Sequence, residues 1–330
     1  TLDAHADRIY SVDVSPDGRY IATGSQDTNV IIWDAATGTP IHTLENHTSV
    51  IFEVKFSNDS TRLISGGGDT IIVWDVESGT LLNSFDIHGD IILDMDVSAD
   101  NSLVFSGSFD GSIALWELES GNVIHSMEAG QITGARFLTD ESRAVTADQD
   151  GNLIIWNLET GEAERTIQHL EAPLRGGVVV APDGNTVIAA DDNGNLIVWD
   201  ISSPIDQPQL LFRGHDNRVT SLAINPAGNQ VTTVSFDYTV IVWDLLGRDA
   251  EIQRFTDHSQ SVYAAVASPD GTQIASGAAD GRLIIWNAES GDILHDIPVD
   301  GGTIYSLDYH PDGTSLLSAS EDGIVRLWDV

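Results

Sequence analysis

The chain carries eight tryptophans at nearly constant spacing, and this spacing constrains the fold more than any other feature. Successive tryptophans lie 40 to 44 residues apart, at Trp33, Trp74, Trp116, Trp156, Trp199, Trp243, Trp286 and Trp328. Each one ends a short aliphatic run, such as VIIW or LIVW, and is followed by Asp, Asn or Glu. Self-similarity at a fixed period indicates a repeat architecture built from one small supersecondary unit. We therefore expect one domain over residues 1–330.

The first repeat predicts four short strands joined by turns, and the later repeats follow the same order. We expect these strands over residues 9–14, 20–25, 30–34 and 41–44. Runs rich in Val and Ile that are separated by Asp, Asn, Gly and Pro turns are typical of all-β proteins. No segment shows the apolar spacing of an amphipathic helix. The pattern predicts an all-β domain.

A period of about 42 residues that ends in Trp-Asp resembles the repeat of WD-repeat β-propellers. The resemblance covers the whole chain. It implies a ring of four-stranded antiparallel blades around a central channel. Seven blades are commonest in this family, but eight repeats favour an eight-bladed propeller. The family's N-terminus supplies the outer strand of the last blade, and Thr1 and Leu2 match only the end of such a strand. We therefore expect a domain cut from a larger protein.

Five repeats also share a histidine, a hydroxyl residue and an aspartate at constant distances before the tryptophan. In the first repeat these residues are His5, Thr23, Asp27 and Trp33. A hydrolase triad uses the same residue types, but it occurs once, in one cleft. The resemblance implies that the four side chains form a buried hydrogen-bonded chain in each blade. We therefore expect no catalytic residue among them.

Three repeats lack part of this set. The fourth, fifth and eighth repeats have, at the histidine position, Glu128, Glu171 and Asp300. The fifth is the most degenerate, with Ala189 and Asn193 at the next two positions, and we expect it to be locally the least protected. The histidines outside the pattern are His125, His169 and His310. Acidic turns that start at Asp148 and Asp191 resemble the beginning of a calcium loop, but a β-turn explains them better, and we expect no metal.

The charge balance excludes several classes of partner. The chain has 14 basic and 51 acidic residues, for a formal net charge of −37. Such a surface repels nucleic-acid phosphates and anionic lipids, so we expect neither as a partner. The sequence has no cysteine and a single lysine, Lys55. Strongly acidic, lysine-poor surfaces suit high salt, where the screening length is short. No signal-peptide pattern or membrane-spanning run is present, and the compartment stays open.

The resemblance also implies contact positions near the channel entrance, three and five residues after the histidine position and one before the turn aspartate. On this chain the candidate partner-binding residues are Arg8, Tyr10, Val50, Phe52, Ile91, Leu93, Phe109, Arg218, Phe236, Tyr263 and Tyr305. They combine an apolar and aromatic arc over neighbouring repeats with two scarce arginines, and aromatics beside arginines anchor interfaces. The corresponding residues of the fourth and fifth repeats are small or polar, so we expect a ligand to sit off-centre.

These patterns favour a non-enzymatic scaffold or sensor domain that binds a protein or peptide on the channel-entrance face. We expect a monomer without a cofactor. Two alternatives remain open: a structural or salt-adapted surface domain, and an enzyme that uses the channel mouth. An enzyme would need one unrepeated cluster of acid, base or metal ligands there, and the repeats show no such departure.

Overall fold

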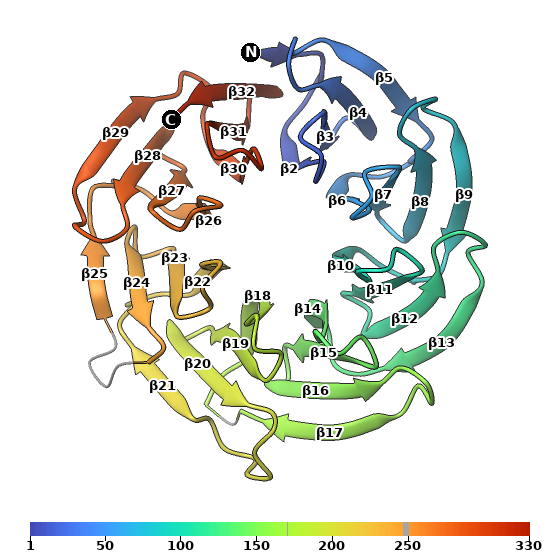
Figure 1. The fold of residues 1–330 in the computed structure, drawn as a ribbon, viewed down its shortest axis with the longest axis vertical. Helices are drawn as coiled ribbons and strands as arrows, with labels where there is room; N and C mark the ends of the chain where they lie inside the picture. Colours follow the sequence, from blue (N-terminus) through green and yellow to red (C-terminus); the bar gives the residue numbers. More distant parts are fainter. Residues whose placement is uncertain (170, 247–250) are drawn as a thin grey trace.

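The computed structural model describes residues 1–169, 171–246 and 251–330, and it shows eight four-stranded antiparallel sheets arranged in a ring (Figure 1). Each of the first seven blades is built from four consecutive strands, beginning with β2 to β5 in blade 1. Blade 8 combines β30, β31 and β32 with β1 from the other end of the chain. The predicted eight-bladed propeller is confirmed.

The strands fall into four sets by their distance from the channel. The innermost strands of blades 1 to 8 are β2 (Ile9–Val14), β6 (Ile51–Phe56), β10 (Ile92–Val97), β14 (Ile132–Phe137), β18 (Leu174–Val180), β22 (Val219–Ile224), β26 (Val262–Ala267) and β30 (Ile304–Tyr309). The second strands are β3 (Tyr20–Ser25), β7 (Arg62–Gly67), β11 (Leu103–Ser108), β15 (Arg143–Asp148), β19 (Thr186–Asp191), β23 (Gln230–Ser235), β27 (Gln273–Ala278) and β31 (Ser315–Ser320). The third strands are β4 (Asn29–Asp34), β8 (Thr70–Asp75), β12 (Ser112–Glu117), β16 (Asn152–Asn157), β20 (Asn195–Asp200), β24 (Val240–Asp244), β28 (Arg282–Asn287) and β32 (Ile324–Asp329). The outer strands are β5 (Pro40–Glu45), β9 (Leu81–Asp86), β13 (Val123–Glu128), β17 (Ala163–Gln168), β21 (Leu210–Arg213), β25 (Glu251–Phe255), β29 (Ile293–Pro298) and, in blade 8, β1 (Leu2–Asp3).

The hydrophobic core lies between blades and is divided into eight clusters. Strand β4 is buried from Val30 to Trp33 because neighbouring blades cover both of its faces. The cluster around Trp33 includes Leu317 and Ala319 from blade 8, and Leu44 packs with Trp74 of blade 2. Strands buried on both sides read as continuous apolar runs, which explains the VIIW pattern. The described residues form no helix long and apolar enough to cross a bilayer.

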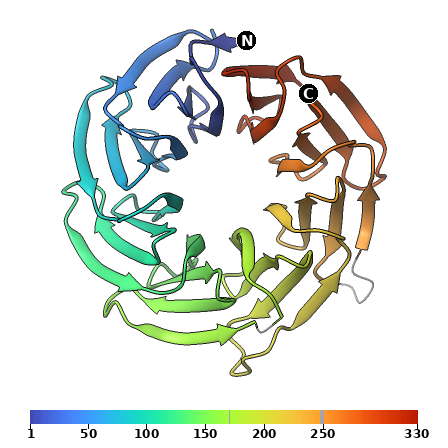
Figure 2. The same cartoon turned by 180° about the vertical axis from the view of Figure 1, so that it is seen from behind.

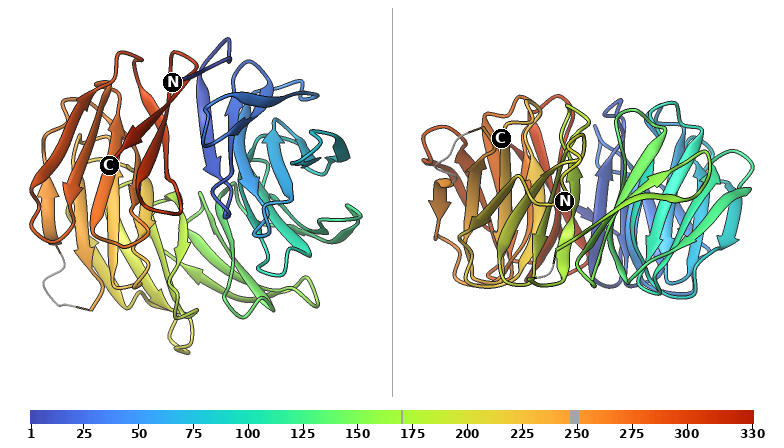
Figure 3. Two further views of the ribbon diagram at one scale, coloured as in Figure 1. Left: turned by 45° about the horizontal axis from the view of Figure 1, so that its top comes forward. Right: turned by 90° about the horizontal axis from the view of Figure 1, so that it is seen from below.

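Blade 8 closes the ring with a short outer strand. Strand β1 pairs with β32 through two residue pairs, Leu2 with Val325 and Asp3 with Ile324. Leu2 is buried in the core shared by blades 1 and 8. Both ends of the chain therefore lie in one blade, and the innermost strands of the eight blades surround the centre of the ring (Figures 1 and 2). Viewed edge-on, the molecule is a short cylinder with its connecting loops on two opposite faces (Figure 3).

Every innermost strand carries a β-bulge near its start. In seven blades one residue is left unpaired with the second strand, namely Tyr10, Phe52, Leu93, Thr133, Thr220, Tyr263 and Tyr305. In blade 5 the bulge contains two residues, Gly176 and Gly177. A bulge re-aims the side chain of its extra residue. The bulges therefore present one residue or residue pair per blade near the channel entrance.

Candidate functional site at the channel entrance

The repeated histidine, hydroxyl residue, aspartate and tryptophan of blade 1 form one continuous chain of hydrogen bonds. His5 Nδ1 meets Asp27 Oδ2 at 2.9 Å, and His5 Nε2 meets Thr23 Oγ1 at 2.7 Å. Trp33 Nε1 donates to the same Thr23 oxygen at 3.0 Å. Burial lowers the pKa of His5, although the nearby Asp27 carboxylate opposes this shift. A buried neutral imidazole held between two partners serves the architecture of the blade.

Among the described residues, blade 6 alone repeats this chain in the same form, through His215, Thr233, Asp237 and Trp243. In blade 2, His47 bonds to Ser65 at 2.7 Å, but its Nδ1 has no partner in the described structure. Burial lowers the pKa of His47 to about 4. In blade 3, the Nδ1 atom of His88 meets Ser112 instead of the aspartate. In blade 7, Trp286 Nε1 is left without a described partner.

Blade 5 replaces the expected network with a different one. The interpretation of His169 as a residue outside the networks is wrong, because its Nε2 lies 2.9 Å from Asp191 Oδ2 and both side chains are buried. Asn195 donates a second hydrogen bond to this carboxylate at 2.7 Å. Glu171, which holds the histidine position in the sequence pattern, forms an ion pair with Arg213 instead. The histidine and the aspartate of this blade therefore each lie two residues earlier in the sequence than the repeat predicts.

The two acidic turns of blades 4 and 5 are β-turns, as the sequence predicts. Asp148 accepts hydrogen bonds from the backbone N–H groups of Asp150 and Asn152. Asp191 accepts them in the same way from Asn193 and Asn195. These carboxylate oxygens already have donors, and the part of the chain that the structure describes gathers no group of three or more metal-binding side chains.

Aromatic side chains from five neighbouring blades form a row along one side of the channel entrance. The ring centroids of Phe236 and Tyr263 lie 5.7 Å apart, and those of Tyr263 and Tyr305 lie 5.5 Å apart. Tyr10 continues the row, 5.1 Å from Tyr305 and 5.2 Å from Phe52. Aromatic pairs at such distances stabilise one another beyond the area they bury. The structure thus brings the predicted arc together as one contiguous surface, which we call the aromatic row.

A cavity of about 630 Å³ lies beside this row. Seven of the eleven predicted contact residues line it, namely Phe52, Ile91, Leu93, Phe109, Arg218, Phe236 and Tyr263. Blades 4 and 5 contribute Thr133, Arg136, Gln149, Arg175 and the glycines of the double bulge, and none of these side chains is aromatic or aliphatic. The cavity, which we call the entrance cavity, therefore reaches over two blades whose residues there are small or polar.

The other four predicted residues, Arg8, Tyr10, Val50 and Tyr305, do not line the entrance cavity. Arg8 forms a 2.7 Å ion pair with Glu321, which joins blade 1 to blade 8. Tyr10 donates a 3.1 Å hydrogen bond to Gln26 of its own blade. Arg8, a predicted contact residue, therefore already has a carboxylate partner within the protein.

The base of the cavity carries charged residues that sequence reasoning missed. Glu53, Asp94 and Arg136 lie there, and Arg136 forms an ion pair with the buried Asp94. Burial and the like charge of Asp94 raise the pKa of Glu53 to about 8. Inner-strand carboxylates also bind the next blade: Asp94 accepts a hydrogen bond from the Ala135 backbone N–H at 2.9 Å.

The same link occurs at other blade boundaries, where Asp13 accepts from Phe56 N–H, Asp96 from Phe137 N–H and Asp308 from Val14 N–H. The signal was present in the sequence as an aspartate at the fifth position of three inner strands, IYSVDV, ILDMDV and IYSLDY.

Comparison with known proteins decides the family. The model for the IFT122 first beta-propeller matches residues 1–200. The model for the WD domain, G-beta repeat, matches residues 206–244, 250–287 and 292–329. The chain belongs to the WD-repeat β-propeller family. The resemblance drawn from the tryptophan spacing is confirmed.

Individual relatives of this WD-repeat propeller are distant. A WD repeat-containing protein WDS homolog of Arabidopsis thaliana is 23% identical over 270 residues, which cover 79% of this chain and 43% of that protein. A guanine nucleotide-binding protein subunit beta of Oryza sativa subsp. indica is 30% identical over 70 residues, or 21% of this chain and 18% of that protein. The chain thus spans less than half the length of these curated relatives. The crystal structure of the computationally designed Ika8 protein superposes with a TM-score of 0.87 at 25% identity, covering 100% of this chain and 98% of the other.

Within the WD-repeat propeller, the chemistry of the entrance separates into two parts. The repeated imidazole, hydroxyl and carboxylate of blade 1 are engaged with one another in the blade network. The entrance cavity has walls of aromatic and aliphatic side chains with a few polar groups. Concave apolar sites with a few placed polar groups are suited to binding a ligand.

Proposed function

We propose that this WD-repeat propeller is a non-enzymatic scaffold that binds a protein or peptide on its channel-entrance face, as one monomeric domain of a larger protein. The observation that carries the proposal is the entrance cavity with its wall of half-buried aromatic and aliphatic residues from blades 2, 3, 6 and 7. Rigid aromatics around a concave site supply contact area at a low cost in side-chain entropy. The relative from Oryza sativa, named as a subunit, is consistent with a role in assembly.

Removal of the rings of the aromatic row tests this proposal. We expect the double variant Tyr10→Ala and Phe52→Ala to retain its fold and to lose the proteins that the wild-type domain retains in affinity purification. The two rings pack against each other at a tilt of 35°, so both contribute to the same surface. Quantitative mass spectrometry of the retained proteins measures the loss, and circular dichroism checks the fold.

The matched control is Tyr20→Ala. Tyr20 begins β3 directly after the turn that follows β2, on the face opposite the channel entrance, and Arg19 stacks on its ring at 5.0 Å. This variant also loses one tyrosine ring, but it leaves the entrance unchanged. If the double variant retains the same proteins as the wild type and the control, the entrance face is not the binding surface.

A further inference from the structure

Among the residues that the structure describes, Arg218 has no carboxylate partner, in a protein with 51 acidic residues. Ten arginines form ion pairs with Asp or Glu in the described structure, namely Arg8, Arg62, Arg136, Arg143, Arg165, Arg175, Arg213, Arg254, Arg282 and Arg326. Within the same described residues Arg218 forms no ion pair, and no hydrogen bond involves its guanidinium group. Only its backbone N–H is bonded, to Asn217 Oδ1 at 2.8 Å.

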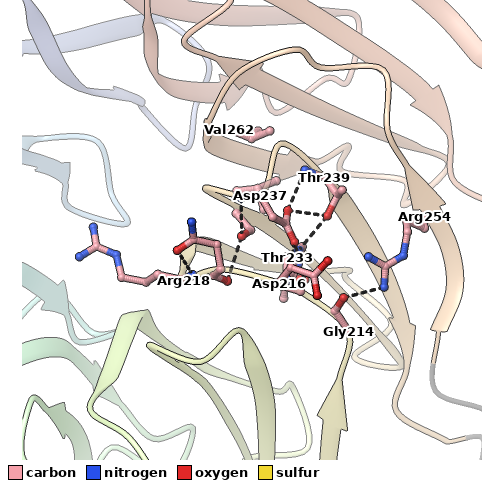
Figure 4. Close-up of polar contacts among 12 residues, drawn as sticks. Gly214, Asp216, Arg218, Thr233, Asp237, Thr239, Arg254 and Val262 are labelled. Atoms are coloured by element: carbon pink, nitrogen blue, oxygen red, sulfur yellow. Dashed lines mark hydrogen bonds and ion pairs between the residues drawn. The ribbon is translucent and has the colours of Figure 1, made fainter.

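The guanidinium group of Arg218 is nevertheless held in place. Its central carbon lies 4.7 Å from the centroid of the Phe236 ring, and Phe236 packs edge-on against Tyr263. Figure 4 shows the side chain directed away from the Asp237 network and toward the centre of the ring, where Arg218 lines the entrance cavity. A guanidinium that stacks on an aromatic face keeps its in-plane N–H donors free.

The cavity has room for a ligand beside this group. Val219 and Thr220 follow Arg218 along the cavity wall, and the blade 5 bulge of Gly176 and Gly177 lies across from them. Both glycines have positive φ, of 80° and 91°. A Cβ atom added to Gly176 would lie 3.1 Å from the Val219 carbonyl oxygen, whereas one added to Gly177 would meet no atom within 4 Å, so the bulge faces open space at Gly177. The seven other blades carry a side chain at this position, and blade 5 leaves a gap.

Of the three arginines that line the entrance cavity, Arg218 is the one available to a ligand. Arg175 forms a 3.0 Å ion pair with Asp192 and a 2.9 Å hydrogen bond with Gln149. Arg136 is engaged with Asp94 at the base. A planar guanidinium with free donors matches a carboxylate, which it can bind through two parallel hydrogen bonds. The apolar wall of Phe52, Leu93 and Phe109 would take a neighbouring hydrophobic side chain.

We propose that the entrance cavity recognises a peptide segment that carries a carboxylate next to apolar residues, with Arg218 as the carboxylate-binding residue. The carboxylate belongs either to the C-terminus of the segment or to an Asp or Glu side chain. This assignment rests on the proposed function and names the chemistry of the ligand. Complementarity of charge supports this assignment, because the Arg218 guanidinium stacks on Phe236 and has no acidic partner within the described part of this strongly acidic molecule.

Selection from a random peptide library tests the proposal. The intact domain is immobilised and used to select from heptapeptides displayed with free C-termini, and the enriched peptides are then synthesised. We expect them to combine apolar residues with a carboxylate, and we expect Arg218→Gln to weaken their binding at least tenfold. Amidation of the C-terminus and Asp→Asn or Glu→Gln exchange within the peptide then show which carboxylate is bound.

The matched control is Arg19→Gln. Arg19 also stacks on an aromatic ring, that of Tyr20, and has no ion pair in the described structure, but it lies on the opposite face. This variant removes the same charge and should bind the selected peptides like the wild type. Thermal unfolding of both variants confirms that they are folded at the temperature of the measurement.

Three results would overturn the assignment. Enriched peptides without a preference for carboxylates, or rich in Lys and Arg, would show that the cavity selects another chemistry. Binding that Arg218→Gln leaves unchanged would show that this residue is not the receptor of the carboxylate. In either case, if binding is lost in the Tyr10→Ala and Phe52→Ala variant, the proposed function stands without this inference. If the wild-type domain enriches no peptide, peptide recognition at the entrance fails altogether.

Discussion

At the scale of single residues, one hydroxyl joins the network of blade 1. Thr23 is fully buried and lies between His5 Nε2 at 2.7 Å and Trp33 Nε1 at 3.0 Å. Asp27 holds the proton on His5 Nδ1, so the hydroxyl donates to the imidazole and accepts from the indole. Removal of one partner from such a network leaves the others buried without a hydrogen bond.

We therefore predict that Thr23→Val destabilises the protein by about 1–3 kcal/mol, although the shape of the side chain is retained. Valine cannot accept from Trp33 or donate to His5, so two buried polar atoms lose their partner. Urea unfolding followed by tryptophan fluorescence measures the change.

The reverse change in blade 5 provides the control. Trp199 Nε1 has no partner in the described structure, and Ala189 occupies the position of the hydroxyl residue. Ala189→Ser should restore the missing acceptor and leave stability unchanged or raised. If Thr23→Val and Ala189→Ser lower the free energy of unfolding equally, then steric crowding, and not hydrogen bonding, determines stability at this position.

A second prediction at this scale concerns Glu53. Its pKa of about 8, raised by burial and Asp94 against the pull of Lys55 and Arg136, exceeds the value of about 4.3 expected in an unfolded chain. Folding therefore takes up a proton, and stability falls as pH rises between these two values. Burial lowers the pKa of His47 and His88 to about 4, so these histidines make stability rise with pH. Their effect is confined to pH values below about 6.5, the pKa of an unfolded histidine.

We predict that the free energy of unfolding of the wild type falls from pH 6.5 to 8.5 and that Glu53→Gln reduces this fall. Part of this pH dependence of stability remains in the variant because of Asp308, since burial and the nearby Asp13 raise the pKa of Asp308 to about 7. Urea unfolding at several pH values gives both slopes. Parallel curves for the wild type and the variant would contradict the assignment of the proton to Glu53.

At the scale of elements, the predicted strands of the first repeat correspond closely to the observed ones. The expected ranges 9–14 and 20–25 are β2 and β3 as observed, while β4 starts one residue earlier and β5 extends by one residue at each end. Such strands are predictable because β-branched runs and turn residues are local signals. The blade 5 network was not predictable in this way, because His169 and Asp191 each lie two residues before the positions that the repeat assigns to the histidine and the turn aspartate. The entrance cavity also escaped prediction, because it depends on a bulge of two glycines whose strand pairing only the fold reveals.

The two-residue strand β1 completes blade 8 and thereby closes the ring. A substitution of Leu2 tests how much this strand contributes to stability. Leu2 is 2% exposed and packs in the cluster that also contains Val325 and Trp33. We predict that Leu2→Asp destabilises the protein by several kcal/mol, since it removes buried apolar surface and places a charge there. Hydrogen exchange should show the greatest loss of protection in β32 and β2.

The matched control is Leu82→Asp in the outer strand β9. Leu82 is 39% exposed, so the same substitution should cost far less. Similar destabilisation by both variants would mean that β1 contributes no more to the fold than an ordinary surface strand.

At the scale of the whole molecule, the main electrostatic feature is the net charge of −37. The 51 acidic residues exceed the 14 basic ones by far, and the mutual repulsion of their carboxylates opposes the compact state. At molar salt the screening length falls to about 3 Å, which removes most of this repulsion. The alternative function as a salt-adapted surface domain depends on this effect.

We predict that the melting temperature rises as NaCl increases from 50 mM to 1 M. Differential scanning calorimetry measures the rise, and sucrose at matched osmolality is the control, because it stabilises by exclusion from the surface and does not screen charge. If the melting temperature rises no more in NaCl than in sucrose, charge repulsion contributes little to stability. The salt-adapted alternative would then lose its support.

The sharing of blade 8 between the two ends of the chain has a consequence for connectivity. Strand β1 lies beside β32, so a short linker could join the two ends and new ends could be opened in a loop between any other two blades. Such a circular permutant keeps every contact between neighbouring blades, because the order around the ring does not depend on where the chain is cut. The propeller thus tolerates rotation of its sequence, whereas deletion of a blade would leave two apolar faces uncovered.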